Sequence, residues 1–129
     1  MTRHQPVTSA LLPKPAGPYS PAVIHDRLVF VSGQGAVDPS TGRLVGDTVE
    51  AQTEQVLKNI SAILEAAGSN LGCVLRCGVF LTDISEFSRM NDVYQRMFAE
   101  NRPARTTVQV SALPRPGLRV EIDAIAYVP

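Results

Sequence analysis

The sequence predicts an α+β fold in which two helices pack on one face of a mixed β-sheet. Two segments repeat apolar residues at helical spacing, and they are interspersed with short segments, rich in β-branched residues, that alternate in polarity. The predicted order is strands, helix, strand, helix and two strands. Because the apolar stripe of each helix is narrow, each helix buries only one side, and covering one sheet face is the simplest arrangement.

The N-terminal part predicts two strands after an irregular start. Residues 1–16 contain three prolines and no continuous apolar run, so they are expected to be irregular and not to form a secretory signal. The segments Tyr19–Ile24 and Leu28–Gln34 have the composition of strands and flank a turn at residues 25–27. After a second turn, a short strand is expected around residues 43–45.

The first helix is expected to begin at Asp47 or Thr48. Asp47 and Glu50 have capping-box spacing, and Gly68 is a typical C-terminal stop. The apolar stripe of this helix contains Val49, Val56, Ile60, Ile63, Leu64 and Ala67.

The second helix follows a strand predicted over residues 74–82. Asp83 and Glu86 offer a cap, and the helix is expected to run to about Ala99. Asn91 falls on the apolar face of this helix, where a buried amide needs hydrogen-bond partners. The side chains expected to face the core are Phe87, Met90, Tyr94, Met97 and Phe98.

The last two strands carry the most informative side chains. The first places Arg105, Thr107 and Gln109 on one face. In the second, Glu121 lies opposite an apolar face formed by Leu118, Val120, Ile122 and Ala124. If these strands pair as a hairpin, Glu121 lies opposite Thr107 or Gln109 and therefore beside the arginine strand. A guanidinium on a strand suits paired hydrogen bonds to a small carboxylate, and a nearby carboxylate suits acid–base chemistry.

One face of this sheet is left uncovered by the two helices. Together with Arg105 and Glu121, it is expected to carry the apolar side chains of Ile125 and Tyr127. Self-association with closed cyclic symmetry would bury such a half-apolar face. A ligand site on this face would then lie between subunits.

The composition favours a single domain over residues 1–129 and a cytoplasmic location. Hydrophobic residues make up 44% of the chain and charged residues 19%, as in an ordinary globular protein. Twelve basic and twelve acidic side chains cancel, so the charge does not favour binding to nucleic acid or to an anionic membrane. No apolar run reaches the ~18 residues of a membrane span.

The cysteines and histidines predict neither a disulfide nor a metal site. If both lie on one strand, Cys73 and Cys77 are roughly 13 Å apart, beyond the ~7 Å that a disulfide tolerates. Their spacing does not match the usual zinc or redox pair, and His4 and His25 lie in the proline-rich start and in a turn. Buried structural thiols are expected.

Six short motifs follow one another between residues 17 and 127. They are Gly17-Pro18-Tyr19-Ser20, Val31-Ser32-Gly33-Gln34, Leu64-Glu65-Ala66-Ala67-Gly68, Asn91-Asp92-Val93-Tyr94, Pro103-Ala104-Arg105-Thr106-Thr107 and Val120-Glu121-Ile122-Asp123-Ala124-Ile125-Ala126. Together they resemble the reactive intermediate deaminases, the RidA or YjgF family. The resemblance implies a chorismate-mutase-like fold, assembled as a homotrimer with three inter-subunit clefts. It also implies hydrolysis of 2-imino acids and their enamine tautomers, such as 2-aminoacrylate, to 2-keto acids and ammonia without a cofactor.

The resemblance also assigns roles to individual residues. Arg105 is expected to bind the substrate carboxylate, and Glu121 to position or activate the attacking water. The other expected cleft residues are Tyr19, Ser32, Gly33, Asn91 and Thr107. Thr107 stands where many members have a cysteine, and Gly35 and Ala36 replace bulkier residues, so the shape of the cleft is expected to differ.

Each of these residues also has a structural interpretation. Arg105 could be an ion-pair partner, Glu121 a solvated surface group, Asn91 a hydrogen-bonded core amide and Tyr19 an interface aromatic. Ser32 has no histidine base nearby in sequence, which disfavours a nucleophilic serine.

Three other functions remain open at this stage. One is a non-enzymatic trimer that binds a keto acid or similar metabolite, and another is a pathway-specific deaminase of the same fold. The third is an endoribonuclease or translation inhibitor, which the neutral net charge and the lack of a basic aromatic stripe disfavour.

Overall fold

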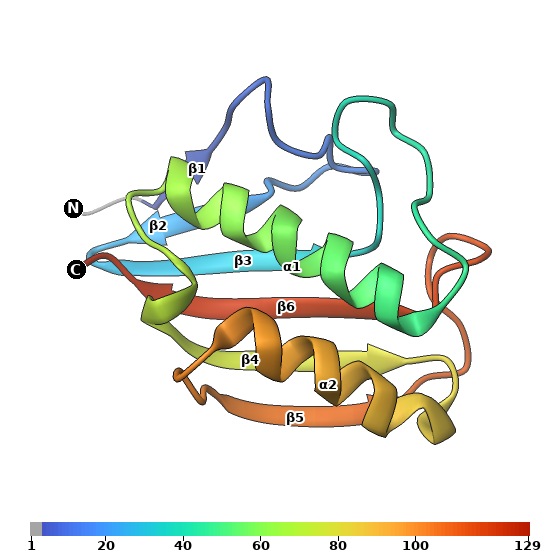
Figure 1. Cartoon of the computed structure of the whole chain (residues 1–129). Helices are drawn as coiled ribbons and strands as arrows, with labels where there is room; N and C mark the ends of the chain where they lie inside the picture. Colours follow the sequence, from blue (N-terminus) through green and yellow to red (C-terminus); the bar gives the residue numbers. More distant parts are fainter. Residues whose placement is uncertain (1–3) are drawn as a thin grey trace.

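The computed structural model describes residues 4–129 and shows one mixed six-stranded sheet with both long helices on the same face (Figure 1). The strand order is β1-β2-β3-β6-β4-β5, and every neighbouring pair is antiparallel except β4 and β5, which are parallel. The predicted fold class is therefore confirmed. The elements are β1 Gln5–Val7, β2 Ala22–His25, β3 Leu28–Gln34, α1 Val49–Ala66, η1 Leu71–Cys73, β4 Val74–Leu81, η2 Ile84–Glu86, α2 Phe87–Phe98, β5 Ala104–Gln109 and β6 Val120–Tyr127.

The core lies between α1, α2 and the sheet face beneath them. The fully buried side chains of α1 recur at helical spacing, as predicted, and meet Val120, Ile122 and Val79 of the central strands, which are also fully buried. Fully burying one such aliphatic side chain stabilises the fold by about 1.5–3 kcal/mol. The buried core side chains of α1 are Val49, Val56, Leu57, Ile60, Ile63 and Leu64.

The ends of α1 show which of two possible caps is used. The Thr48 hydroxyl accepts a hydrogen bond from the Ala51 amide at 3.1 Å, so Thr48 is the N-cap and the predicted capping box of Asp47 with Glu50 is wrong. The predicted stop at Gly68 is confirmed, since its φ of 83° lies in the left-handed region that glycine tolerates.

Of the two residues predicted to cap the second helix, only Asp83 caps a helix, and that helix is η2. Asp83 accepts a hydrogen bond from the Ser85 amide at 2.9 Å and thereby caps the short helix η2, from which α2 continues. Glu86 does not cap α2, because its carboxylate is buried and pairs with Arg89 at 2.7 Å and Arg119 at 3.2 Å. The charge of Glu86 therefore ties the start of α2 to the start of β6.

Three short segments at the N-terminal side differ from the prediction. Residues 4–16 are not wholly irregular, since β1 pairs with β2, and Pro6 is tolerated there because β1 is an edge strand. The prediction for residues 1–3 lies outside the described residues. The predicted strand Tyr19–Ile24 starts only at Ala22. The strand predicted at 43–45 is a single bridge between Val37 and Leu44.

The pairing of the last two strands is the most consequential difference. The hairpin between β5 and β6 is wrong, because β4 lies between them and β5 runs parallel to β4 after a crossover through α2. Arg105 pairs with Cys77, which is fully buried on the helix side, whereas Glu121 pairs with Phe80 on the open side. Arg105 and Glu121 thus lie on opposite faces of the sheet.

Candidate functional site

Arg105 lies at the edge of the helix-covered face, where α2 crosses β5. Its guanidinium carbon lies 4.7 Å from the centre of the Tyr94 ring and 5.5 Å from that of Phe87, so two aromatic rings hold it by cation–π contacts. No carboxylate of residues 4–129 lies within ion-pair distance of Arg105. The interpretation of Arg105 as an ion-pair partner within the chain is therefore wrong, and its positive charge is free to bind a ligand.

The groups around Arg105 leave hydrogen-bonding capacity unused. Within the described part of the chain, four buried side-chain oxygens have no hydrogen-bond partner, and three of them belong to Asn91, Tyr94 and Thr107. Asn91 and Tyr94 line a cavity of about 300 Å³ together with Arg105, while Thr107 follows Arg105 on the same face of β5. Because buried polar groups are normally satisfied, this group is a candidate place for a ligand or another chain to bind.

The same surroundings set the ionisation of two neighbouring groups. Burial raises the pKa of the Tyr94 hydroxyl, and the nearby Cys77 thiol raises it further. Burial likewise raises the pKa of Cys77, which is a free thiol, as is Cys73. Both side chains are therefore neutral near pH 7, and the charged side chains that line this cavity are those of Arg105 and Arg102. The expectation of buried structural thiols is confirmed for both cysteines.

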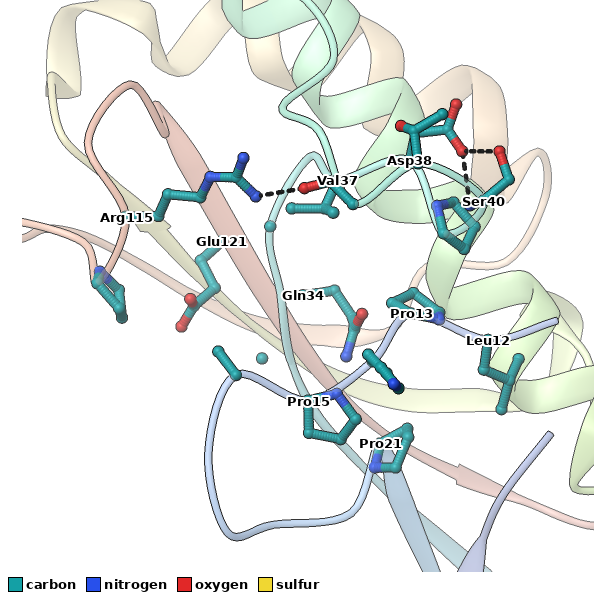
Figure 2. Close-up of a pocket in the computed structure, with 18 of the residues that line it drawn as sticks. Leu12, Pro13, Pro15, Pro21, Gln34, Val37, Asp38, Ser40, Arg115 and Glu121 are labelled. Carbon is teal, nitrogen blue, oxygen red and sulfur yellow. Dashed lines mark hydrogen bonds between the residues drawn. The ribbon is translucent and has the colours of Figure 1, made fainter. Parts of the chain in front are cut away.

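Glu121 lies on the opposite face, at one end of a second and larger cavity of about 660 Å³ (Figure 2). Its carboxylate leans over Gly33 of β3, where a Cβ atom would lie only 2.6 Å from Glu121 Oε2. Gly33 is therefore needed for the carboxylate to adopt this position. Burial raises the pKa of Glu121, and the neighbouring carboxylate of Asp123 raises it further, which favours a base that exchanges protons readily.

Tyr19 lines the Glu121 cavity, and Ser32 directly precedes the lining residue Gly33 in β3. The Tyr19 hydroxyl accepts a hydrogen bond from the Ala16 amide at 3.2 Å, and its side chain lines the cavity while half exposed. The Ser32 hydroxyl donates to the carbonyl oxygen of Ser20 at 2.7 Å, which fixes the turn before β2. Ser32 therefore has a structural bond, in agreement with the expectation that it is not a nucleophile.

The seven predicted site residues form two groups and not one. Asn91, Arg105 and Thr107 lie on the helix-covered side at the β5 edge. Glu121 lies on the open side with Tyr19 and Gly33, which line its cavity, and with Ser32 next to Gly33. The prediction that Arg105 and Glu121 share one open face is wrong. The reason is that β4 lies between β5 and β6. The pairing of β5 with β4 decides which face Arg105 occupies, and the sequence pattern alone did not specify that pairing.

Sequence reasoning assigned Tyr94 and Phe87 to the core and missed their contacts with Arg105. Tyr94 is three residues after Asn91, and this spacing places the two side chains on one helix face, so the signal was present. Phe87 is 38% exposed and so is not a core side chain, contrary to prediction. Met90, Tyr94 and Phe98 are buried as predicted.

Residues 4–129 contain no cluster of three or more histidine, cysteine, aspartate or glutamate side chains that could hold a metal ion. No helix within the same range is both long and apolar enough to cross a membrane.

Comparison with known proteins identifies the family. The family model described as Endoribonuclease L-PSP matches residues 9–128. A RutC family protein from Pyrococcus horikoshii is 50% identical over 115 residues, 89% of this chain and 90% of its own. The human protein named 2-iminobutanoate/2-iminopropanoate deaminase is 44% identical over 120 residues, 93% of this chain and 87% of its own.

A solved structure agrees with these sequence relatives. RidA from an Antarctic Psychrobacter superimposes with a TM-score of 0.90 at 44% identity, covering 95% of this chain and 98% of that one. The chain therefore belongs to the Endoribonuclease L-PSP family, also known as the RidA or YjgF family.

Proposed function

We propose that this protein hydrolyses 2-imino acids and their enamine tautomers, such as 2-aminoacrylate, to 2-keto acids and ammonia. The observation that carries the proposal is the unpaired guanidinium of Arg105, held by aromatic rings and surrounded by unpartnered polar atoms. A small planar carboxylate satisfies such a group through paired hydrogen bonds. The deaminase name carried by mammalian relatives supports this choice of substrate.

The complete site requires two copies of the chain. Arg105 and Glu121 lie on opposite faces of one sheet, so one small substrate within a single chain does not reach both. The open face also carries apolar side chains about 40% exposed, which a second copy would bury. They include Leu28, Phe30, Val108 and Tyr127. A homotrimer in which Arg105 of one copy meets Glu121 of the next would join the two groups in three equivalent clefts.

The proposed reaction needs only proton transfer and positioning. Arg105 holds the substrate carboxylate. The Glu121 carboxylate takes a proton from a water molecule while the oxygen of that water bonds to the carbon of the protonated imine. That proton passes from Glu121 to the nitrogen of the resulting carbinolamine, and the carbon–nitrogen bond breaks to release ammonia. The regenerated Glu121 carboxylate takes the proton of the hydroxyl, whose oxygen becomes the keto oxygen. One water is consumed for each ammonia released, so no cofactor is needed. The cytoplasm as the location remains a prediction from the sequence.

The proposal can be tested with imines made in situ. An amino-acid oxidase generates the 2-imino acid, semicarbazide traps what remains, and the loss of trapped product measures hydrolysis. We expect hydrolysis with the native protein, with Arg105→Ala reducing it to the background level. Arg96→Ala is the matched control, because Arg96 is an exposed α2 arginine whose only ion pair is with Glu54 in the described chain. Equal trapping with and without protein, across several imines, would leave binding of keto acids without turnover as the function.

A further inference from the structure

Glu86 is a buried carboxylate that the proposed reaction does not use. It is only 4% exposed and lies where η2 passes into α2. Its oxygens pair with Arg89 of α2 at 2.7 Å and with Arg119, just before β6, at 3.2 Å. Both arginine side chains are about half exposed, so water also stabilises their charges. Because burying the carboxylate is costly, its ion pairs are expected to fix geometry more than to add stability.

The start of α2 is held by these ion pairs and not by a capping hydrogen bond. Glu86 occupies the N-cap position of α2, but its side chain makes no capping bond. Arg89 extends the network to Glu50 of α1 at 3.6 Å, and Arg119 donates to the Asp47 carbonyl at 3.0 Å. The direction in which α2 leaves η2 is therefore set by charge pairing to α1 and to the start of β6.

The side of α2 that faces Arg105 begins at the residue directly after Glu86. Phe87, Asn91 and Tyr94 recur at positions i, i+4 and i+7, so they lie on one face of the helix. Helix α2 lies over β4 and β5 (Figure 1). The rings of Phe87 and Tyr94 lie 5.5 and 4.7 Å from the guanidinium carbon of Arg105. Tyr94 is buried and Phe87 is 38% exposed, so a shift of the first turn would displace the Phe87 ring first.

The strand that carries Arg105 is tied to the same short helix. Gln109 is the last residue of β5, and its side-chain oxygen accepts a hydrogen bond from the Ile84 amide at 2.8 Å. Helix η2 is thus joined to α2 through the chain and to β5 through Gln109, and Arg105 lies between these two elements. Glu86, at the end of η2, is the charged group that holds this junction against the start of β6.

We propose that Glu86 is a positioning residue for Arg105. Its two ion pairs fix the first turn of α2, so that the Phe87 ring holds the guanidinium in the orientation that binds a carboxylate. The kinetic consequence of this inference rests on the proposed function, whereas its structural consequence does not. A guanidinium donates paired hydrogen bonds only within its plane, so a ring that limits rotation of that plane lowers the cost of binding a planar carboxylate. Glu86 itself does not touch the substrate.

The structural consequence is tested without any substrate. Aromatic rings move the NMR signals of nuclei above them upfield, so the side-chain signals of Arg105, assigned by their loss in Arg105→Ala, are expected upfield of those of solvent-exposed arginines. Glu86→Gln keeps the size of the side chain and removes its charge, and it is expected to move these signals toward their position in Phe87→Leu. Glu54→Gln is the matched control, because Glu54 of α1 also pairs with an α2 arginine, Arg96, and its loss is expected to leave the signals unmoved.

The kinetic consequence is tested by imine hydrolysis with the same variants. Because the substrate carboxylate is unchanged during the reaction, Glu86→Gln is expected to raise KM about tenfold and to change kcat by less than about twofold. Phe87→Leu is expected to act in the same way. The double variant is expected to resemble Phe87→Leu alone, since both changes act through one contact. A residue that only stabilises the fold would leave KM unchanged well below the melting temperature.

Arg89→Gln gives a second measurement if Glu86→Gln folds poorly, because it removes the shorter ion pair from a half-exposed position. It is expected to move the Arg105 signals in the same direction by a smaller amount. Unmoved signals with a native KM, or effects of Glu86→Gln and Phe87→Leu that multiply in the double variant, would overturn the positioning role while Arg105-dependent hydrolysis survives. If the signals move but the native protein hydrolyses no imine, the proposed function fails and the positioning of Arg105 by Glu86 stands.

Discussion

The two faces of the sheet are built from the same strands but have different physical roles. On the helix-covered face, Ile122 and Val120 are fully buried against α1 and α2. On the open face, Phe30 and Tyr127 remain about 40% exposed, and the carboxylates of Glu121 and Asp123 lie among them. Strand alternation thus separates residues that stabilise the chain from residues available for assembly and chemistry.

The two proposed catalytic groups lie on different faces of the sheet. Arg105 belongs to the covered face, yet it lies on the edge strand β5, where the sheet has no further neighbour. Glu121 belongs to the open face of the central strand β6, where its surroundings raise its pKa. An edge position and an open face are the two places where one chain can present groups to another.

The largest expected effect comes from removing Arg105 in one chain and Glu121 in another. Arg105→Ala and Glu121→Gln are each expected to lower kcat/KM about a thousandfold, which corresponds to loss of about 4 kcal/mol of interaction with the transition state. If the site joins two copies, co-refolding the variants in equal amounts restores about a quarter of the sites in a closed ring. The measurement is imine hydrolysis before and after co-refolding. A mixture as inactive as its components would place both groups in one chain.

The next effect compares two isoleucines of β6 on opposite faces. Ile122→Ala is expected to lower the free energy of unfolding by about 3 kcal/mol at any protein concentration, because it leaves a cavity in the core. Ile125→Ala is expected to act mainly on assembly, so its melting temperature should fall on dilution more steeply than that of the native protein. Denaturant and thermal melts at several concentrations measure both. Equal, concentration-independent losses would contradict the division.

A smaller effect is expected at a buried amide of the covered face. The Gln52 side chain donates to the carbonyls of Gly46 and Gly117 and accepts from the Arg119 amide at 2.7 Å. Gln52→Leu leaves these buried backbone groups unpaired and is expected to lower the free energy of unfolding by about 2 kcal/mol. Gln55→Leu is the control, since Gln55 donates only to Asn59. Similar losses of unfolding free energy in both variants would show that the hydrogen bonds from Gln52 to the backbone of Gly46, Gly117 and Arg119 contribute little.

The smallest effect is a shift in pH dependence on the open face. The pKa of Glu121 is raised first by burial and then by Asp123, so activity should appear at a pH above the ordinary titration range of a glutamate. Asp123→Asn removes a negative charge and should move the acidic limb of kcat/KM to lower pH. Because the neutral form is favoured in the fold, the stability from Glu121 is present at low pH and is lost as pH rises through its raised pKa. An unmoved limb in Asp123→Asn would exclude this coupling.

Most elements were predictable because their signals are local. The 3.6-residue stripe of α1, the glycine that ends it and the β-branched run of β3 depend only on neighbouring residues, and β3 agrees to the residue. β1 was missed because three residues containing a proline carry almost no strand signal. They pair only because β2 supplies an edge.

The geometry of the candidate site was not predictable from the sequence, and the roles of its residues stay predictions. The motif resemblance selected Arg105, Glu121 and Asn91, and the structure places them at cavities. The hairpin was wrong because alternation within a strand says which residues share a face and not which strand lies beside it. That choice depended on β4, which is remote from β5 in sequence.

The sequence by itself determined the two helices, the class of fold and the family, since these follow from local periodicity and from motifs read in order. Only the tertiary structure decided that Arg105 and Glu121 lie on opposite faces and that Arg105 packs against Tyr94. It also decided that Gly35 and Leu118 shape one wall of a cavity. The physical reason is that strand order and side-chain contact arise from long-range burial of the whole core, which no short stretch of residues specifies.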